Sequence, residues 1–368
     1  MLEQFKVKEE DAIRVPEAGL RETVTAFFVR MGVPAEDAAL AADVLVLADL
    51  RGVETHGVSN TPRDYLTGYS EGEINPRPDW RIVRESPATA TIDCDAGIGL
   101  VIAPKAMEIA IAKAEKVGLG MVTMRNGRHL GMAAYHAMMA LEHDMIGMCM
   151  TSTPASMVPT FGAEPRLGTN PIAVAAPAGK EPPFIFDAAS TAVAGNKLLL
   201  ARRLGTNILP GWLADENGTP IMEEFPAPEP SFRGAQTTFM LPVGGTRELG
   251  SHKGYGWASI VEVLGGILTG GGYGMNPGRP NFGHSVAAYK IDAFMDVADF
   301  KRTMDEWLET LRTTKPAPGH DRVFYPGLPE AEDEADRRAN GIPLHPEVVE
   351  WFRDVCAELE IPFKLTDS

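Results

Sequence analysis

Apolar residues recur at intervals of three and four near the start of the chain, which is the spacing of one face of a helix. The positions that predict this first helix, over residues 16–31, are Leu20, Val24, Phe27, Phe28 and Met31. A second helix is predicted from Pro34 to Arg51, because proline and acidic residues suit a first helical turn. Together they predict a helical hairpin. Two late helices, at 293–313 and 346–359, show the same periodicity.

The pattern changes after the proline-rich linker at 75–78, where short apolar runs alternate with helical stretches. The predicted strands are 89–93, 120–124, 145–150, 172–176, 184–187 and 285–291. The predicted helices between and after them are 103–117, 130–141 and 257–268. Strands that alternate with helices indicate an α/β domain. Residues 205–242 are rich in proline, glycine and acids, and we expect them to be irregular apart from a turn at 215–218.

Polar loops follow three of the predicted strands, at 125–129, 151–153 and 187–191. Ligands of open α/β sheets gather at the carboxyl ends of strands, so these loops are the candidate cofactor site. Lys253 stands beside glycines at the start of a predicted helix, where free N–H groups and the helix dipole would add to its charge. Lys253 therefore indicates an anion site, and a solvated lysine in a glycine-rich turn is the alternative.

His56 lies just beyond the second predicted helix, between Arg51 and Gly57. A histidine can exchange a proton near neutral pH because its unperturbed pKa is about 6.5. The catalytic interpretation competes with a simpler one, in which glycine ends the helix and His56 is merely exposed. Spacing alone does not decide between them.

Composition limits the classes of partner. The chain has 368 residues and a formal net charge of −16, which suits a globular protein of about two domains and disfavours nucleic acid and anionic membranes as partners. The first residues are too charged for a signal peptide, and no apolar run approaches the roughly 20 residues that span a bilayer. Cys94, Cys149 and Cys356 are far apart and are expected to be reduced thiols. These features predict a cytoplasmic protein.

Familiar catalytic motifs are missing from the sequence. Gly97 and Gly99 follow a strand, but Ile102 stands where a Rossmann fingerprint needs its third glycine. There is no P-loop and no hydrolase elbow. The histidines at 129, 136 and 143 share a helix face but would lie about 10 Å apart, too far for one ion, so no metal site is expected. The residues taken alone do not identify the reaction.

Five segments resemble motifs of the type 2 malate/L-lactate dehydrogenase family, in the family's order. They are 51–58 (RGVETHGV), 125–131 (RNGRHLG), 167–172 (LGTNPI), 186–191 (FDAAST) and 253–256 (KGYG). The resemblance implies an NAD- or NADP-dependent oxidoreductase acting on a 2-hydroxy or 2-oxo acid, usually as a homodimer. Its relatives also include cyclic imino acid reductases, which are one alternative, and a non-catalytic metabolite-binding relative is another.

The resemblance also implies a domain arrangement. Residues 1–80 would form the helical part of a substrate and dimer domain, and residues 259–368 would complete it. Residues 81–258 would form a non-Rossmann α/β domain that binds the nicotinamide cofactor.

Carried over motif by motif, the resemblance implies roles for individual residues. His56 and His129 match histidines that transfer the proton. The residues that match positions holding the dinucleotide are Thr151, Asp187, Ala188, Ala189, Ser190, Lys253 and Gly327. Asn60 departs from the family, since many members have a carboxylate-binding arginine there. The candidates for the substrate site are therefore Asn60 itself and the neighbouring arginines, Arg51 and Arg63.

Overall fold

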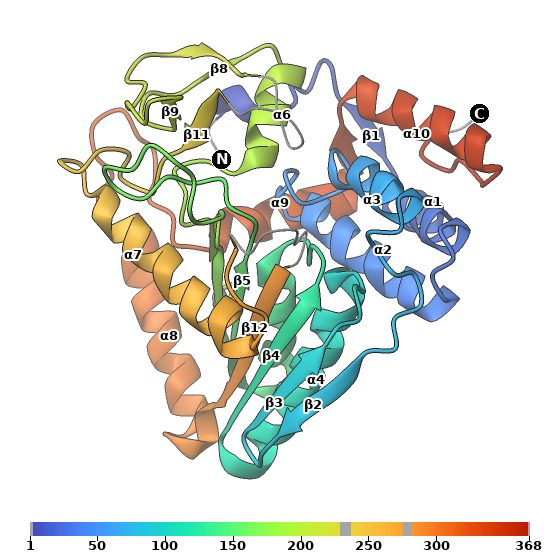
Figure 1. The fold of residues 1–368 in the computed structure, drawn as a ribbon. Helices are drawn as coiled ribbons and strands as arrows, with labels where there is room; N and C mark the ends of the chain where they lie inside the picture. Colours follow the sequence, from blue (N-terminus) through green and yellow to red (C-terminus); the bar gives the residue numbers. More distant parts are fainter. Residues whose placement is uncertain (1–2, 229–236, 275–281, 367–368) are drawn as a thin grey trace.

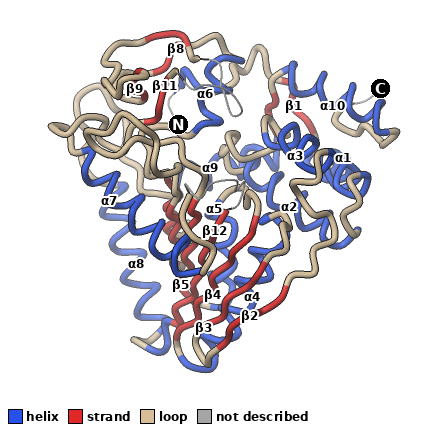
Figure 2. Tube along the Cα trace, in the orientation of Figure 1, coloured by secondary structure: helices blue, strands red, loops and turns tan. Residues whose placement is uncertain are grey.

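The structure is a computed structural model that describes residues 3–228, 237–274 and 282–366 (Figure 1). A mixed seven-stranded sheet forms its centre (Figure 2). In spatial order the strands are β2 (Arg81–Glu85), β3 (Thr89–Asp93), β4 (Leu119–Gly127), β12 (Phe282–Lys290), β5 (Met145–Ser152), β6 (Ile172–Ala176) and β7 (Phe184–Ala188). β3 and β4 are parallel, and the other neighbours are antiparallel. The predicted α/β class is confirmed, although the exposed strand β2 was not predicted.

The register of the sheet brings the predicted cofactor loops to one edge. β4 and β5 both run antiparallel to β12, and β7 runs in the same direction as β5 across β6. Gly127 pairs with Phe282 at the end of β4, and Thr151 pairs with His284 near the end of β5. The carboxyl ends of β4, β5 and β7 therefore meet at the same edge, as predicted.

Two helices cover one face of the sheet, α4 (Gly99–Val117) and α5 (Ala133–Met138). They lie very close to the strands, because a Cβ at Gly120 or Gly147 would come within 1.9 Å of the carbonyl oxygen of Ala110 or Ala137. The helix predicted over 130–141 is instead the short α5 followed by a 3-10 helix, Met139–His143.

A second layer joins the two ends of the chain. It contains α1 (Glu17–Arg30), α2 (Ala35–Leu50), α3 (Thr61–Ser70), α9 (Leu328–Asn340) and α10 (Pro346–Leu359). Strand β1 (Ile13–Val15) pairs with β13 (Ile342–Leu344), and one apolar core is shared by α1, α2 and α10. The predicted helical hairpin and the last predicted helix are confirmed, and the apolar residues of all three helices lie in this core.

A small lobe packs above the sheet edge (Figure 1). It contains α6 (Gly195–Arg203), β8 (Asn207–Ile208), β9 (Leu213–Asp215), β10 (Phe225–Pro226) and β11 (Thr238–Met240), together with the N-terminal 3-10 helix Glu3–Phe5. In the described part of segment 205–242, two-stranded pairs are present where we expected irregular structure, together with the expected turn at 215–218; residues 229–236 lie outside the described residues. Helix α6 was not predicted.

Helix α7 (Ser251–Val261) continues into a π-helical turn, Glu262–Gly266, and a 3-10 turn, Ile267–Thr269. The helix begins six residues before the predicted start at Trp257, so two glycines lie inside it. One of them, Gly254, allows close packing, since its Cβ would lie 2.4 Å from the backbone nitrogen of Val243. The π turn meets the sheet face opposite α5, where Ser152 Oγ donates to Glu262 at 2.9 Å.

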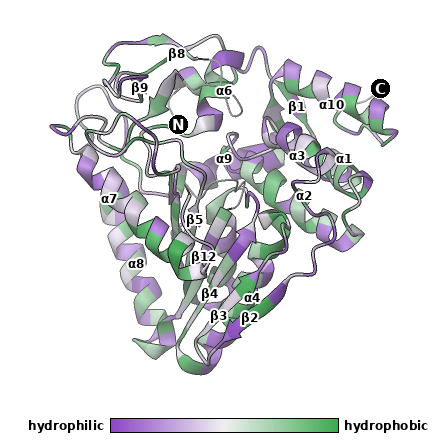
Figure 3. Ribbon diagram, in the orientation of Figure 1, coloured by the Kyte–Doolittle hydropathy of each residue, from purple (hydrophilic) through white to green (hydrophobic). Residues whose placement is uncertain are grey.

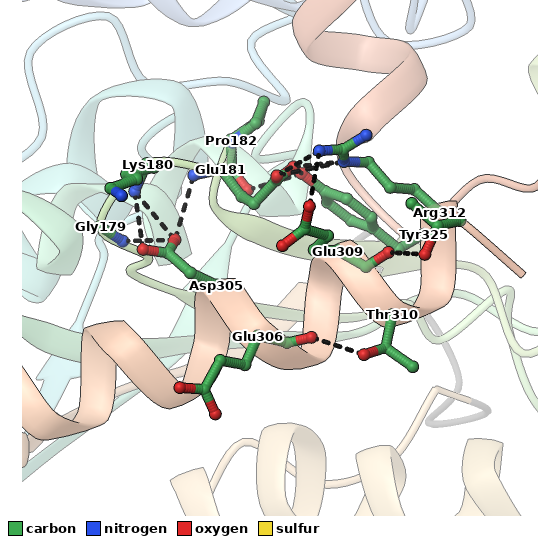
Figure 4. A network of polar contacts seen from close by, with 11 residues as sticks. Gly179, Lys180, Glu181, Pro182, Asp305, Glu306, Glu309, Thr310, Arg312 and Tyr325 are labelled. Atoms are coloured by element: carbon green, nitrogen blue, oxygen red, sulfur yellow. Dashed lines mark hydrogen bonds and ion pairs between the residues drawn. The ribbon is translucent and has the colours of Figure 1, made fainter.

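Helix α8 (Val297–Arg312), which follows the 3-10 helix Ile291–Ala293, fastens the loop between β6 and β7 (Figure 4). The Asp305 carboxylate accepts from three successive backbone nitrogens, those of Gly179, Lys180 and Glu181, at 2.8–3.0 Å. Arg312 binds both carboxylate oxygens of Glu181. Burial alone would raise the pKa of Asp305, but the three N–H donors lower it.

All three cysteines are free and buried, in agreement with the prediction of reduced thiols. Within the ranges that the structure describes, no helix has the length and apolar character needed to cross a membrane.

Candidate active site

The loop after α2 is fixed by buried polar contacts that position His56. The Asp49 carboxylate, at the end of α2, accepts from Val58 N at 2.7 Å. From α9, Arg337 donates to the Asp49 carbonyl oxygen at 2.6 Å and to Glu54 at 2.9 Å. The loop is therefore held at both ends by groups that lie almost entirely inside the protein.

Gly57 allows this closure, because a Cβ there would lie 2.1 Å from a carboxylate oxygen of Asp49. Burial raises the pKa of Asp49 to about 8, so the group holds its proton at neutral pH. A protonated carboxyl can accept from Val58 without leaving a buried charge.

His56 and His129 stack on each other, with ring centroids 5.7 Å apart and ring planes 18° from parallel. The hydroxyl of Thr55 lies 2.8 Å from Nδ1 of His56, and the hydroxyl of Tyr65 lies 2.7 Å from Nδ1 of His129. Phe282 packs edge-on against His129. With each Nδ1 engaged by a hydroxyl, the Nε2 atoms are the ones left to meet a ligand. The interpretation of His56 as a merely exposed residue at a helix end is wrong.

Both histidines are neutral at physiological pH, although each keeps some solvent access. Burial lowers the pKa of His56 to about 4 and that of His129 to about 3. At His129 the neighbouring His56 adds to the effect of burial, because a second positive charge beside it would be unfavourable. A neutral imidazole pair is prepared to accept a proton rather than to release one.

Two of the predicted cofactor residues point toward α5 and have partners inside the protein. The hydroxyl of Thr151 contacts Nδ1 of His284 on the adjacent strand. The carboxylate of Asp187 accepts from Ala134 N, in the first turn of α5, at 2.7 Å. Burial raises the pKa of Asp187 to about 7, which places it between its charged and neutral forms at physiological pH.

Ala188 ends β7, and Ala189 and Ser190 follow it at the same edge. Ser190 is buried, and its hydroxyl donates to the Asn170 carbonyl oxygen at 2.7 Å. Its contribution in this structure is to hold the loop after β7 against the loop before β6.

Gly327 sits immediately before α9 with a φ of +99°, a conformation that favours glycine. A Cβ there would lie 2.8 Å from the backbone nitrogen of Ile185 in β7. The start of α9 is thereby brought against the same strand that carries Asp187.

Lys253 lies in the first turn of α7. This helix begins directly after Gly250, whose φ is +99°. The side chain of Lys253 is exposed, and it lies far along the chain from both histidines. The prediction that this lysine stands at a glycine-rich helix start is confirmed.

The two arginines predicted near the substrate already face carboxylates. Arg51 Nη1 lies 2.8 Å from Glu334 in α9, and the side chain of Arg51 is 5% exposed. Arg63 Nη2 lies 2.6 Å from Glu347 in α10. Neither is a free guanidinium in this structure.

Asn60, at the N-terminus of α3, meets an arginine that sequence reasoning missed. Arg203 Nη2 donates to Asn60 Oδ1 and to the Ser59 carbonyl oxygen, both at 3.0 Å. Arg203 comes from α6, 143 residues further along the chain. The pairing has no sequence signal, because helix α6 itself was not predicted. Tyr65 was also missed, although its place in the same helix, five residues after Asn60, could have indicated it.

The chain is similar to proteins of known activity. A family model described as malate/L-lactate dehydrogenase matches residues 15–353. The malate dehydrogenase of Pyrococcus abyssi is 38% identical over 361 residues, which cover 96% of this chain and 97% of the relative. The L-sulfolactate dehydrogenase of Methanocaldococcus jannaschii is 38% identical over 90% of this chain and 92% of its own.

The name of a third relative includes its cofactor. The ureidoglycolate dehydrogenase (NAD(+)) of Escherichia coli O157:H7 is 29% identical, over 92% of this chain and 95% of its own length. The solved structure of malate dehydrogenase from Pyrococcus horikoshii OT3 superimposes with a TM-score of 0.86 at 35% identity, covering 97% of this chain and 98% of that one. The resemblance inferred from the five motifs is confirmed: the chain belongs to the malate/L-lactate dehydrogenase family of oxidoreductases.

Proposed function

We propose that this protein transfers a hydride between a nicotinamide cofactor, NAD or NADP, and a small 2-hydroxy acid or its 2-oxo counterpart. The observation that carries the proposal is the stacked pair of neutral histidines, His56 and His129, whose Nδ1 atoms are both engaged by hydroxyls. Malate, sulfolactate and ureidoglycolate, the substrates named for the relatives, define the class of compound.

Oxidation of a secondary alcohol removes a hydride from carbon and a proton from oxygen. Bound nicotinamide supplies the hydride acceptor. The histidine pair takes the proton, and the Tyr65 hydroxyl orients His129 through Nδ1. In this proposal one histidine acts as the base and the other holds the substrate oxygen.

The cofactor site in this proposal lies at the sheet edge where β4, β5 and β7 end. Thr151, Asp187, Ala188, Ala189 and Ser190 contribute from the strand ends, and Gly327 contributes from the start of α9. Lys253 fits a phosphate, since its exposed side chain lies in the first turn of α7, where the helix dipole favours an anion.

We propose that the nucleotide-binding part has a non-Rossmann sheet, which is supported by a single parallel pair, β3 and β4. The helical domain, in this proposal, combines residues 1–80 with residues of 259–368. Strand β12 belongs to the latter range, yet it lies between β4 and β5 and completes the sheet of the 81–258 part.

We also propose a homodimer, with helix α7 and the turns after it as the contact. Exposed apolar side chains lie along this segment, including Trp257, Ile260, Val263, Ile267 and Leu268, which are 44–56% exposed. The ribbon of α7 is coloured hydrophobic toward its lower end in Figure 3. Mass measurement by light scattering tests the contact. Ile260→Glu should yield monomer, whereas Val29→Glu, at an exposed apolar residue of α1, should leave the dimer intact.

The test of function combines both cofactors with a panel of 2-hydroxy acids, 2-oxo acids and cyclic imines. Enhanced fluorescence of NADH or NADPH on mixing and turnover of a hydroxy or oxo acid would support the dehydrogenase. Turnover of cyclic imines alone would establish the imino acid reductase instead. Failure of both nucleotides to bind would leave only the non-catalytic relative.

A further inference from the structure

Two arginines near Asn60 share a single carboxylate. Arg63 from α3 and Arg203 from α6 approach the two oxygens of Glu347 at 2.6 and 2.5 Å. Burial alone would raise the pKa of Glu347, but the two guanidinium groups lower it, so the carboxylate is charged. The cluster of Asn60, Arg63, Arg203 and Glu347, here called the arginine cluster, therefore carries one uncompensated positive charge.

The arginine cluster also has more hydrogen-bond donors than acceptors. Among the residues that the structure describes, Arg203 Nη1, Arg63 Nε and Asn60 Nδ2 are buried and have no partner. The Arg203 side chain is only 9% exposed, and Asn60 is 3% exposed. Buried donors without partners are rare in native proteins, so these three call for an acceptor.

The arginine cluster adjoins the histidine pair. Asn60 lies four residues after His56 at the start of α3, and Tyr65 in that helix binds His129. Arg203 reaches the backbone of the same segment at Ser59 O, while Asn196 in α6 donates to Thr55 O at 2.7 Å. An anionic group held by the arginine cluster would therefore belong to a molecule that can also reach the two imidazoles.

We propose that Arg203, together with Asn60 and Arg63, binds an acidic group of the substrate, a carboxylate or a sulfonate. The inference rests on the proposed dehydrogenase function and adds its specificity-determining residue. An oxyanion would supply acceptors for the three donors and cancel the excess charge. Arg203, reaching in from α6, thus provides a guanidinium where position 60 has none, and Glu347 holds that guanidinium in place.

The first test is Asn60→Asp, which replaces the amide NH2 donor by a carboxylate oxygen acceptor and leaves the side chain nearly the same size. The new carboxylate would pair with Arg203, so the melting temperature should rise while kcat/KM for oxaloacetate falls on the order of 10- to 100-fold. A purely structural cluster would gain stability and retain activity. An unchanged kcat/KM would thus overturn the proposal.

The second test needs no turnover and uses malonate as the probe. Malonate should raise the melting temperature of the parent protein and should lose this effect in Arg203→Gln. Arg202→Gln, at the exposed neighbouring position, is the matched control and should respond like the parent. An equal malonate response in Arg203→Gln would refute the subsite.

Binding of NADH, measured on the same samples, separates the two proposals. A parent that binds neither NADH nor NADPH refutes the dehydrogenase. A parent that binds cofactor but whose Arg203→Gln variant reduces oxaloacetate and pyruvate with unchanged KM refutes only the subsite. A rise in KM for both acids assigns the arginine cluster to the carboxylate next to the reacting carbon, and a rise for oxaloacetate alone assigns it to the distal one.

Discussion

Replacing Arg337 by methionine should loosen the loop that carries His56. Arg337 spans from α9 to Glu54 and to the carbonyl oxygen of Asp49, so one side chain ties the end of α2 to the catalytic loop. Methionine fills much of the same volume without the charge. Glu54 would then lose its hydrogen-bonded counterion and keep only the electrostatic influence of Lys197.

The expected loss of folding stability follows from the burial of the Arg337–Glu54 pair. The side chains of Arg337 and Glu54 are 7% and 3% exposed, and their charged atoms are 2.9 Å apart. At an effective dielectric constant near 20 the attraction is about 6 kcal/mol. Loss of one partner of such a pair costs about 3–5 kcal/mol, because the remaining charge is stranded. At an unfolding entropy of about 2.1 cal/mol/K per residue, this cost lowers the melting temperature by roughly 4–6 °C.

The assay is thermal unfolding of Arg337→Met between pH 5 and pH 8. Burial already raises the pKa of Glu54, and removal of Arg337 raises it further. A carboxyl whose folded pKa exceeds its unfolded value loses stability as the pH rises through the folded pKa. The stability that Arg337→Met loses relative to the parent should therefore grow with pH, by up to about 1.4 kcal/mol per pH unit.

Two variants complete the experiment. Glu54→Gln combined with Arg337→Met should remove the pH dependence, since no ionisable group remains at that pair. Arg338→Met is the matched control, because this neighbouring arginine is 45% exposed and pairs at the surface with Glu17 and Glu334. A deficit in Arg337→Met no larger than in Arg338→Met, or one independent of pH, would refute this account.

Three further predictions concern the reaction. His56→Ala and His129→Ala should each lower kcat by about 10²–10⁴-fold while retaining NADH fluorescence enhancement; parent-like turnover in either variant excludes that histidine. For hydroxy-acid oxidation, kcat/KM should stay constant from pH 8 to about pH 5, because the lowered pKa values keep both imidazoles unprotonated; a decline centred near 6.5 would contradict this. Lys253→Ala should weaken cofactor binding more than it slows the chemical step, and an unchanged dissociation constant would place Lys253 outside the site.

Local signals were sufficient to predict helices α1, α2 and α10. Apolar spacing indicated α1 and α10, which contribute to the core of the helical layer, and a proline with acidic residues indicated the first turn of α2. Strand positions followed in the same way from short apolar runs, and β6 was found at its predicted ends. The order of strands was beyond local reasoning. β12 enters the centre of the sheet more than a hundred residues after β5, and no local pattern encodes that pairing.

The candidate site, too, could be predicted from the sequence only in part. His56 and His129 could be named from motifs, each within two residues of a glycine. Their stacking could not be predicted, nor could the contacts of Arg203 with Asn60 and of Arg337 with Glu54. These contacts join segments 143 and 283 residues apart, and they depend on how whole layers pack.

The tie between Glu54 and Arg337 also constrains when the catalytic loop can form during synthesis. The two residues are separated by 283 positions, so a ribosome adding about 5–20 residues per second makes the loop and then spends roughly 14–57 s before its anchor exists. Through that interval Glu54 lacks the guanidinium that binds it in the folded protein. The helical hairpin can assemble early, but the loop that carries His56 is anchored only once α9 has left the exit tunnel.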